Sequence, residues 1–292
     1  MKNKLCLALF VSLFLVCNIS LAQDVKFGIR GGMNLPSIMA GGKSTPVSEG
    51  YQSRTAVGWG LFTELQLNPK FSLRLGVEYS GMGGKKDGMQ AMPTMRLITE
   101  MGNSIGMGVT DQQLAALGAL MVGLPPYYYA NVENTVKFDY VMLPLMAQFG
   151  WDIGQSPWRV YVNAGPFASF LLSGKQVSKG SSKLYYNDSG ASTLWDVLPV
   201  EVKGFVSSEF PAIGETLGGE IPFGTTNITG ELKSTNFGIT GNAGIRYQCN
   251  RNYFFLELGG NYGFITVQDD DVNGSNRIGA ASVMVGYAFS LF

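Results

Sequence analysis

Acidic residues near the C-terminus have the spacing of half a calcium-binding loop. The stretch from Asp269 to Gly274, DDDVNG, matches the pattern D-x-D-x-N-G, in which carboxylate and amide oxygens surround the cation. The full pattern needs a bidentate acid at its twelfth position, where this chain has Ala280, and flanking helices that the sequence does not predict. We therefore expect a solvated hairpin loop with an Asn-Gly turn. Asp269, Asp271 and Asn273 remain the metal-binding alternative.

The chain contains no histidine. This excludes Ser-His and Cys-His nucleophile pairs and His-ligated metal sites, and it removes the usual general base of catalysis at neutral pH. The glycine-rich run from Gly81 to Lys86 is not a phosphate-binding loop, because Tyr79 stands where a glycine is required and no Ser or Thr follows the lysine. We expect neither catalytic residues nor a cofactor, and a membrane-embedded hydrolase is disfavoured.

A separate set of charged residues falls on one face of the segments that alternate in polarity. These are Arg30, Glu64, Arg74, Glu78, Arg246 and Glu257, together with Asn242 and Asn261. If the segments enclose a lumen, the charges must pair with one another, because an isolated buried charge is costly. The set then forms a structural ion-pair network, and the alternative is a polar path for a ligand.

Eight segments show the period of two that is typical of strands with different surroundings on their two faces. They cover approximately residues 25–33, 55–67, 71–82, 136–150, 158–172, 234–248, 254–264 and 277–292. In the fourth segment the apolar phase changes by one residue near Pro144, which predicts a β-bulge. The chain also ends on an apolar strand, which would be an exposed edge in a soluble domain.

The connections between these segments alternate long and short, as in bacterial outer-membrane barrels with short periplasmic turns and long outer loops. Charged residues are only 14% of the chain, against about 25% in typical soluble domains, and 39 residues are glycine. We therefore predict an all-β protein: an eight-stranded antiparallel transmembrane up-and-down β-barrel with long extracellular loops. Aromatic residues near the strand ends are expected at the membrane interfaces: Trp59, Tyr79, Tyr140, Trp151, Trp158, Tyr247 and Tyr253.

The N-terminus has the pattern of an export signal. Lys2 and Lys4 precede an apolar core from Leu5 to Cys17, and Ser20-Leu21-Ala22 forms a cleavage site. We expect a signal peptide at 1–22 and a single barrel domain at 23–292, with loop inserts at 83–135 and 173–233 and a short helix at 110–124. The expected partners are outer-membrane lipid and the barrel assembly machinery. The formal net charge of zero gives no reason to expect nucleic acid.

The two inserts carry aromatic residues outside the alternating segments. They are Tyr127, Tyr128, Tyr129 and Trp195, with Phe205 and Phe210. Such side chains can contact a protein or glycan partner, or they can form a small core within the loops. Both interpretations remain open from the sequence.

Several motifs resemble one known family. They are FGIRGGMN (27–34), the Asn68-Pro69 turn, LRLGVEYSGMG (73–83), PLMAQFGW (144–151) and GYAF (286–289). Together they are similar to the PorT-like outer-membrane β-barrels of Bacteroidetes-type bacteria. The resemblance covers the strands but not the two inserts. It implies the same fold in the outer membrane, and roles that include a part in protein secretion.

Two functions follow as hypotheses. The first is a non-catalytic membrane anchor or interaction protein whose surface loops bind a partner or ligand, as part of an envelope or secretion complex. The alternative is a narrow channel or carrier for a small solute. Opposite charges, glycines and Phe62 on the lumen face predict a packed interior, which favours the anchor.

Overall fold

The computed structural model describes residues 25–40, 45–105, 118, 120, 122–269 and 275–290. The predicted signal peptide, the predicted helix start at Thr110 and two of the proposed metal ligands, Asp271 and Asn273, lie outside these residues. From the predicted helix at 110–124, Gly118, Leu120, Val122 and Gly123 are described and helical, and Leu124 is described as a bend.

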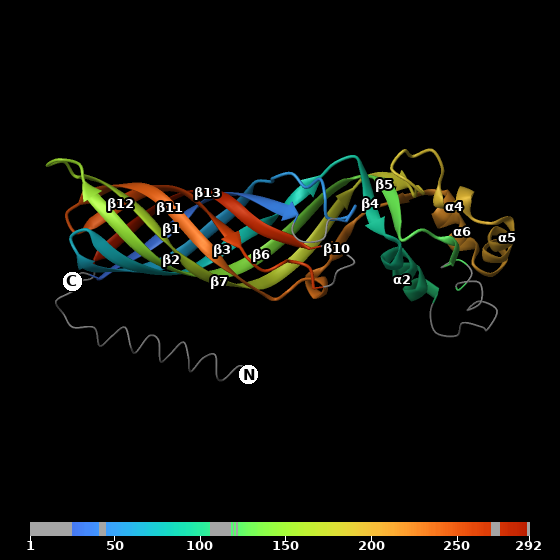
Figure 1. The fold of residues 1–292 in the computed structure, drawn as a ribbon, viewed down its shortest axis with the longest axis horizontal. Coiled ribbons are helices and arrows are strands. Elements are labelled where there is room, and N and C mark those ends of the chain that lie inside the picture. Colours follow the sequence, from blue (N-terminus) through green and yellow to red (C-terminus); the bar gives the residue numbers. More distant parts are fainter. Residues whose placement is uncertain are drawn as a thin grey trace, which may run out of the picture.

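Eight long strands form a closed antiparallel barrel (Figure 1). They are β1 (Val25–Ala40), β2 (Ala56–Asn68), β3 (Phe71–Lys86), β6 (Glu133–Asp152), β7 (Trp158–Lys179), β11 (Thr235–Cys249), β12 (Asn252–Gly263) and β13 (Asn276–Ser290). Each strand pairs with the next in this order, and β13 pairs with β1 to close the ring. The barrel therefore has no free edge strand, which is what a sheet in lipid requires.

The barrel is apolar outside and polar inside. On β2, Val57, Trp59 and Leu61 expose 59%, 59% and 58% of their surface, whereas the alternate residues Phe62 and Glu64 expose 3% and 1%. This is the reverse of a soluble protein, where large apolar side chains point inward. Trp59 stacks on Tyr79 of β3 with ring centroids 6.0 Å apart, so aromatic rings also lie on the outer face.

Short turns lie at one end of the barrel, here called the turn end, and long connections lie at the other, the head end. The β2–β3 turn is tight because Asn68 Oδ1 accepts hydrogen bonds of 2.9 Å from the backbone N–H groups of Lys70 and Phe71. The β6–β7 and β11–β12 turns also lie at this end. Since the strands alternate in direction, β1 begins and β13 ends there too.

The strands at the head end are longer than the alternation predicts. β3 continues to Lys86 and β6 begins at Glu133, so the first insert is shorter than 83–135. β7 continues to Lys179, so the second insert begins after position 173. The predicted boundaries are wrong because these strand ends keep their ladder pairing after the lipid-facing apolar pattern has stopped.

The two inserts form one folded unit beyond the barrel, here called the head (residues 87–132 and 180–224). Its elements are β4 (Met89–Pro93), α2 (Thr94–Ile105), β5 (Tyr127–Asn131), β8 (Ser181–Lys183), α4 (Leu194–Val197), α5 (Val200–Glu209), α6 (Pro211–Gly218) and β9 (Glu220–Pro222). β4 pairs with β5, and β8 pairs with β9. β10 (Thr225–Asn227) and the 3-10 turn η1 (Thr229–Glu231) lead the chain back to β11, with β10 pairing with β7. Figure 1 shows the head at one end of the long barrel.

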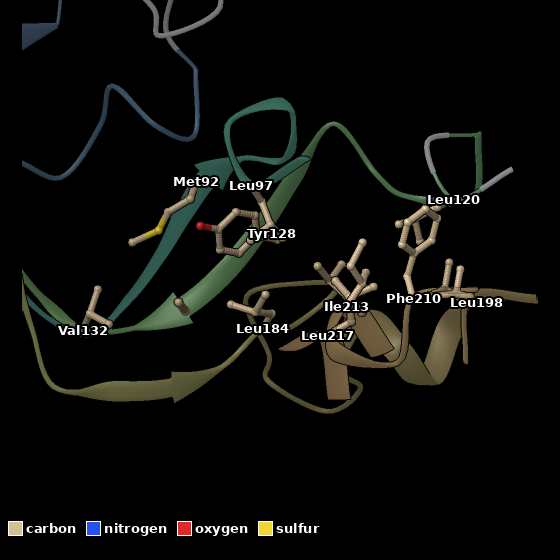
Figure 2. Close-up of a cluster of buried hydrophobic side chains, with 13 residues drawn as sticks. Met92, Leu97, Leu120, Tyr128, Val132, Leu184, Leu198, Phe210, Ile213 and Leu217 are labelled. Carbon is tan, nitrogen blue, oxygen red and sulfur yellow. The ribbon is translucent and has the colours of Figure 1, made fainter. Parts of the chain in front are cut away.

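A hydrophobic core holds the head together (Figure 2). Leu184, Leu194 and Leu217 from the second insert are completely buried, and Leu120 from the first insert exposes only 1% of its surface. Two of the helices begin at known N-terminal sequence motifs. Thr193 and Asp196 form a reciprocal capping box at the start of α4, and Pro211 is the first residue of α6. The head is therefore a packed unit built from both inserts.

The expectation of a bulge near Pro144 is wrong. β6 has no bulge at Pro144, because its buried positions alternate without interruption from Asn134 to Gly150. The apparent phase change arises because the lumen is itself apolar toward the head end, where Val136 and Phe138 point inward. The register irregularity lies instead where β7 pairs with Asp139 and Tyr140.

Two of the aromatic residues expected at the membrane interface lie inside the barrel. Tyr140 exposes 3% of its surface and Tyr253 none, whereas Trp151 and Trp158 are outward and about half exposed. The lumen accommodates these two tyrosines because the ring of Tyr140 packs in an apolar cluster and the ring of Tyr253 packs on Phe255. No helix among the described residues has the length and apolarity to cross a membrane.

Candidate functional site

The structure brings the six predicted lumen charges together inside the barrel. Arg30 of β1 donates to Glu78 of β3 at 2.6 Å and to Glu257 of β12 at 2.8 Å. Arg74 of β3 donates to the other oxygen of Glu257 at 2.5 Å. Tyr161 of β7 also donates to Glu257, at 2.9 Å. This cluster pairs two arginines with two glutamates across the lumen. The Nε and Nη2 of Arg74 and the Oε1 of Glu78 have no hydrogen-bond partner among the described residues.

A second cluster surrounds Glu64 of β2. Arg246 of β11 donates to it at 3.2 Å, Ser72 of β3 also at 3.2 Å, and the hydroxyl of Tyr253 completes the set. Glu64, Arg74 and Glu257 are at most 1% exposed, so the pairs are buried rather than solvated. The other predicted lumen residues have separate contacts: Asn242 donates to Asn163 at 2.8 Å, and the Oδ1 of Asn261 has no hydrogen-bond partner.

Aromatic rings fill the space between the charges. The guanidinium of Arg74 lies 4.0 Å from the ring centroid of Phe62, which packs edge-on against Phe255 with centroids 5.7 Å apart. A Cβ atom at Gly28 would lie 2.2 Å from Phe62 Cζ, so the glycine is what admits the ring. Phe62, Phe255 and the charged pairs therefore form a plug across the lumen.

Toward the head end the lumen is packed by an apolar cluster. It comprises Ile38, Met82, Val136, Phe138, Tyr140, Ile228, Val267, Ile278 and Ala280. A cavity of about 10 Å³ lies near Tyr140 and Met142, which is space for at most one water molecule. The described lumen thus has a charged plug near its middle and an apolar plug above it.

Above the apolar plug, where the barrel meets the head, lies a cavity of about 210 Å³, here called the mouth cavity. Lys86, the last residue of β3, and Arg96 of α2 both line it. The ammonium of Lys86 donates to the carbonyl of Val47 at 2.7 Å and lies 4.3 Å from the ring centroid of Tyr51. Burial lowers the pKa of Lys86 to about 8 and raises that of Tyr51 to about 12.

The remaining predicted site residues are not brought together. Asp269 is exposed and its backbone N–H donates to the carbonyl of Glu231. No group of three Asp, Glu or Cys side chains that could hold a metal ion is found among the described residues. Tyr128 is buried in the head core, whereas Tyr127 and Tyr129 are partly buried.

Trp195 is partly buried and packs against the head core. Sequence reasoning missed Lys86, because it lay in a glycine-rich run examined only for phosphate binding. The alternation of β3 could have indicated Lys86 if it had been continued beyond Met82. It places Lys85 and Lys86 on opposite faces of the strand, with Lys86 on the buried face.

A closed eight-stranded barrel with an apolar outer face and a plugged polar lumen defines the class of outer-membrane β-barrels. The model of the outer membrane protein beta-barrel domain family matches residues 21–269, well over half of the chain. The protein belongs to this family. A search of curated protein sequences finds no significant match.

Solved outer-membrane barrels are similar over most of their length. Neisserial surface protein A is 13% identical, with 91% of this chain and 97% of that chain covered and a TM-score of 0.36. Ail, the attachment invasion locus protein of Yersinia pestis, is 10% identical, with 91% and 99% covered and a TM-score of 0.33. The outer membrane protease OmpT from Escherichia coli is 8% identical, with 93% and 99% covered and a TM-score of 0.39.

Proposed function

We propose that the protein is a non-catalytic outer-membrane anchor that presents the head at the cell surface to a protein or glycan partner. The observation that carries the proposal is the packed core of the head, which draws 13 buried side chains from both inserts. Loops that only connect strands need no core. Burying a large apolar side chain contributes about 1.5–3 kcal/mol, so the core supports a fixed surface rather than mobile loops. A preformed surface loses less conformational entropy on binding.

The head also leaves apolar side chains uncovered. Val122 and Val200 expose 89% and 77% of their surface, and Val197 exposes 37%. The first two belong to different inserts but lie near one another, because a Cβ atom at Gly123 would be 3.1 Å from Leu198 Cδ2. Exposed apolar groups brought together in this way are typical of contact surfaces. Within the family, the motifs described above favour a PorT-like member acting in an envelope or secretion complex.

Conductance separates this proposal from the alternative of a narrow channel or carrier. We expect the purified protein to give no steady current in planar bilayers, because the charged and apolar plugs fill the lumen. A variant with a shortened head should also be silent, since the plugs lie in the barrel. Arg74→Ala combined with Glu78→Ala should lower stability without producing selective current. Reproducible ion-selective currents in the intact protein, re-tuned by these substitutions, would establish the channel instead.

Surface contact is tested by a photo-crosslinking amino acid placed at Val200 in intact cells. We expect a crosslinked product of higher mass, whose sensitivity to protease or to glycosidase identifies the class of partner. The same probe at Val57 on the barrel exterior is the matched control, since it should contact only lipid. Equal products from both positions, or none from Val200, would contradict the proposal.

A further inference from the structure

The mouth cavity is built from both parts of the molecule. The barrel contributes Ile38, Lys86 and Phe138, and the head contributes Met92 and Leu97. Its volume of about 210 Å³ corresponds to about seven water molecules at their liquid volume of ~30 Å³ each. A small organic molecule of about ten non-hydrogen atoms therefore fits within this volume without a change in the walls.

The cavity has an apolar floor and polar walls. The floor is the apolar plug, of which Ile38, Val136, Phe138, Ile228 and Val267 line the cavity. The walls carry the amide side chains of Gln90, Asn134, Gln176, Gln268 and Asn276. Asn276 is completely buried and its Oδ1 has no hydrogen-bond partner in the described part of the chain, so the wall is not saturated by these contacts. Such a combination suits a ligand with one apolar and one polar end.

Lys86 supplies the charge. The residue is only 7% exposed, and its ammonium makes one hydrogen bond, to the carbonyl of Val47. An ammonium has three donors, so two make no hydrogen bond to the described residues. The carboxylate of Glu49 acts on Lys86 electrostatically, but no carboxylate of the described residues lies within ion-pair distance of its ammonium. The other cation of the cavity, Arg96, is 3.7 Å from Glu231. Among the described residues, Lys86 therefore has no direct ion-pair partner, and Glu49 compensates its charge only from a distance.

A buried, unpaired cation is costly, and a lysine at a strand end can normally extend its ammonium into water. The neighbouring Lys85 is exposed in this way. Lys86 instead lies over Tyr51 at the edge of the mouth cavity, which is partly apolar and partly open. We propose that the mouth cavity binds a small organic monocarboxylate, with its anionic group beside Lys86 and its apolar body on the floor.

This site is separate from the proposed role of the head. Its floor is the apolar plug, so the ligand enters from the head end and leaves by the same route. The volume and the apolar floor favour an organic acid over an inorganic anion. The inference holds whether or not the head has a macromolecular partner.

The experiment measures binding of 3-phenylpropionate to the full chain in nanodiscs by calorimetry at neutral pH. Its neutral isostere 3-phenylpropionamide has nearly the same shape without the charge. We expect a Kd for the acid below roughly 1 mM and at least about tenfold weaker binding of the amide, a difference of ~1.4 kcal/mol. Equal affinity for acid and amide, or no binding of the acid, would overturn the proposal.

Substitutions locate the site. Lys86→Met should weaken binding of the acid about tenfold and leave binding of the amide unchanged, whereas Lys86→Arg should retain the preference for the acid. The matched control is Lys85→Met, which removes an exposed lysine from the adjacent position and should bind like the unsubstituted protein. Gel heat-modifiability establishes that each variant has folded. Full affinity in folded Lys86→Met, or an equal loss in Lys85→Met, would refute the assignment.

Discussion

Glu257 of β12 accepts a hydrogen bond of 2.8 Å from Arg30 of β1, a residue 227 positions earlier in the chain. The same carboxylate accepts 2.5 Å and 2.9 Å hydrogen bonds from Arg74 and Tyr161. One buried anion therefore connects four strands that lie on different sides of the barrel. Such a contact cannot form until the ring has closed, so its energy stabilises the closed barrel specifically.

The substitution Glu257→Gln is expected to destabilise the barrel by about 3–5 kcal/mol. The amide keeps the volume of the side chain but leaves Arg74 buried without an ion-pair partner and Arg30 paired with Glu78 alone. The measurement is the urea midpoint of unfolding in lipid vesicles, read from the gel shift of folded and unfolded protein.

The control removes an exposed ion pair of the same chemistry. Glu133 lies 3.7 Å from Lys179, with both side chains more than half exposed, so Glu133→Gln should cost less than about 1 kcal/mol. Equal midpoints for the two variants would show that the buried network does not stabilise the closed barrel.

The substitution Gly28→Ala is expected to cost about 1–3 kcal/mol through overpacking. The new methyl group would lie 2.2 Å from Phe62, whose ring is held between Arg74 and Phe255. Phe62→Leu in the same chain should recover part of the loss. Gly31→Ala on the same strand is the control, because its nearest side-chain atom would be 3.7 Å away. A comparable loss at Gly31, measured by the same urea midpoint, would point to backbone effects rather than crowding.

The sequence was sufficient for the barrel because lipid and lumen impose opposite polarity on adjacent residues. Leu61 and Phe62 show the limit of that rule, since both are apolar and only one faces lipid. The charged residues resolve this ambiguity: Glu64 and Arg74 can face only inward, so they assign the phase of their strands. Where the lumen itself becomes apolar, at Val136 and Phe138, the pattern no longer distinguishes the faces and the predicted bulge was wrong.

The head could not be predicted in the same way. Its core joins Leu120 with Leu194 and Leu217 across two inserts, and no local periodicity relates residues so far apart. The same holds for the mouth cavity, where Lys86 of β3 and Arg96 of α2 line one space although no local pattern relates them. Local signals such as the Thr193–Asp196 capping box indicate where a helix begins but not what it packs against.

Binding of 3-phenylpropionate should weaken as the pH rises through about 8. Burial lowers the pKa of Lys86 from 10.5 to about 8, so the ammonium that attracts the anion loses its proton above that pH. One unit higher only about a tenth of the sites remain charged, and the apparent affinity falls roughly tenfold.

Among the described residues, the other ionisable side chains that act on Lys86 or line the mouth cavity are Glu49, Tyr51, Arg96, Tyr128 and Glu231. Burial raises the pKa of Tyr51 to about 12, so its phenol stays neutral through this window. Lys86→Arg isolates the contribution of the lysine, because a guanidinium keeps its charge above pH 9. An identical decline of affinity with pH in the arginine variant would assign the titration to another group.

Labelling of intact cells should distinguish the two ends of the barrel. Cys249 is exposed at the β11–β12 turn, which we expect in the periplasm because outer-membrane barrels have their short turns on that side. A membrane-impermeant thiol reagent should miss Cys249 and label a cysteine introduced at Ser189, in an exposed turn of the head. Disruption of the outer membrane should expose both thiols. Labelling of Cys249 alone before disruption would reverse the orientation.

The head and the barrel should lose structure separately. Leu217 is completely buried in the head core, so Leu217→Ala is expected to cost the head about 2–5 kcal/mol. The stability of the barrel should not change, because Leu217 packs against head residues and the lumen plugs are made by other side chains. Limited proteolysis of protein in vesicles should therefore cut the head of the variant faster, while gel heat-modifiability of the barrel is unchanged.

Val200→Ala alters an exposed side chain of the same unit and should leave both readouts unchanged. A lower unfolding midpoint of the barrel in Leu217→Ala would instead mean that head and barrel fold as one cooperative unit.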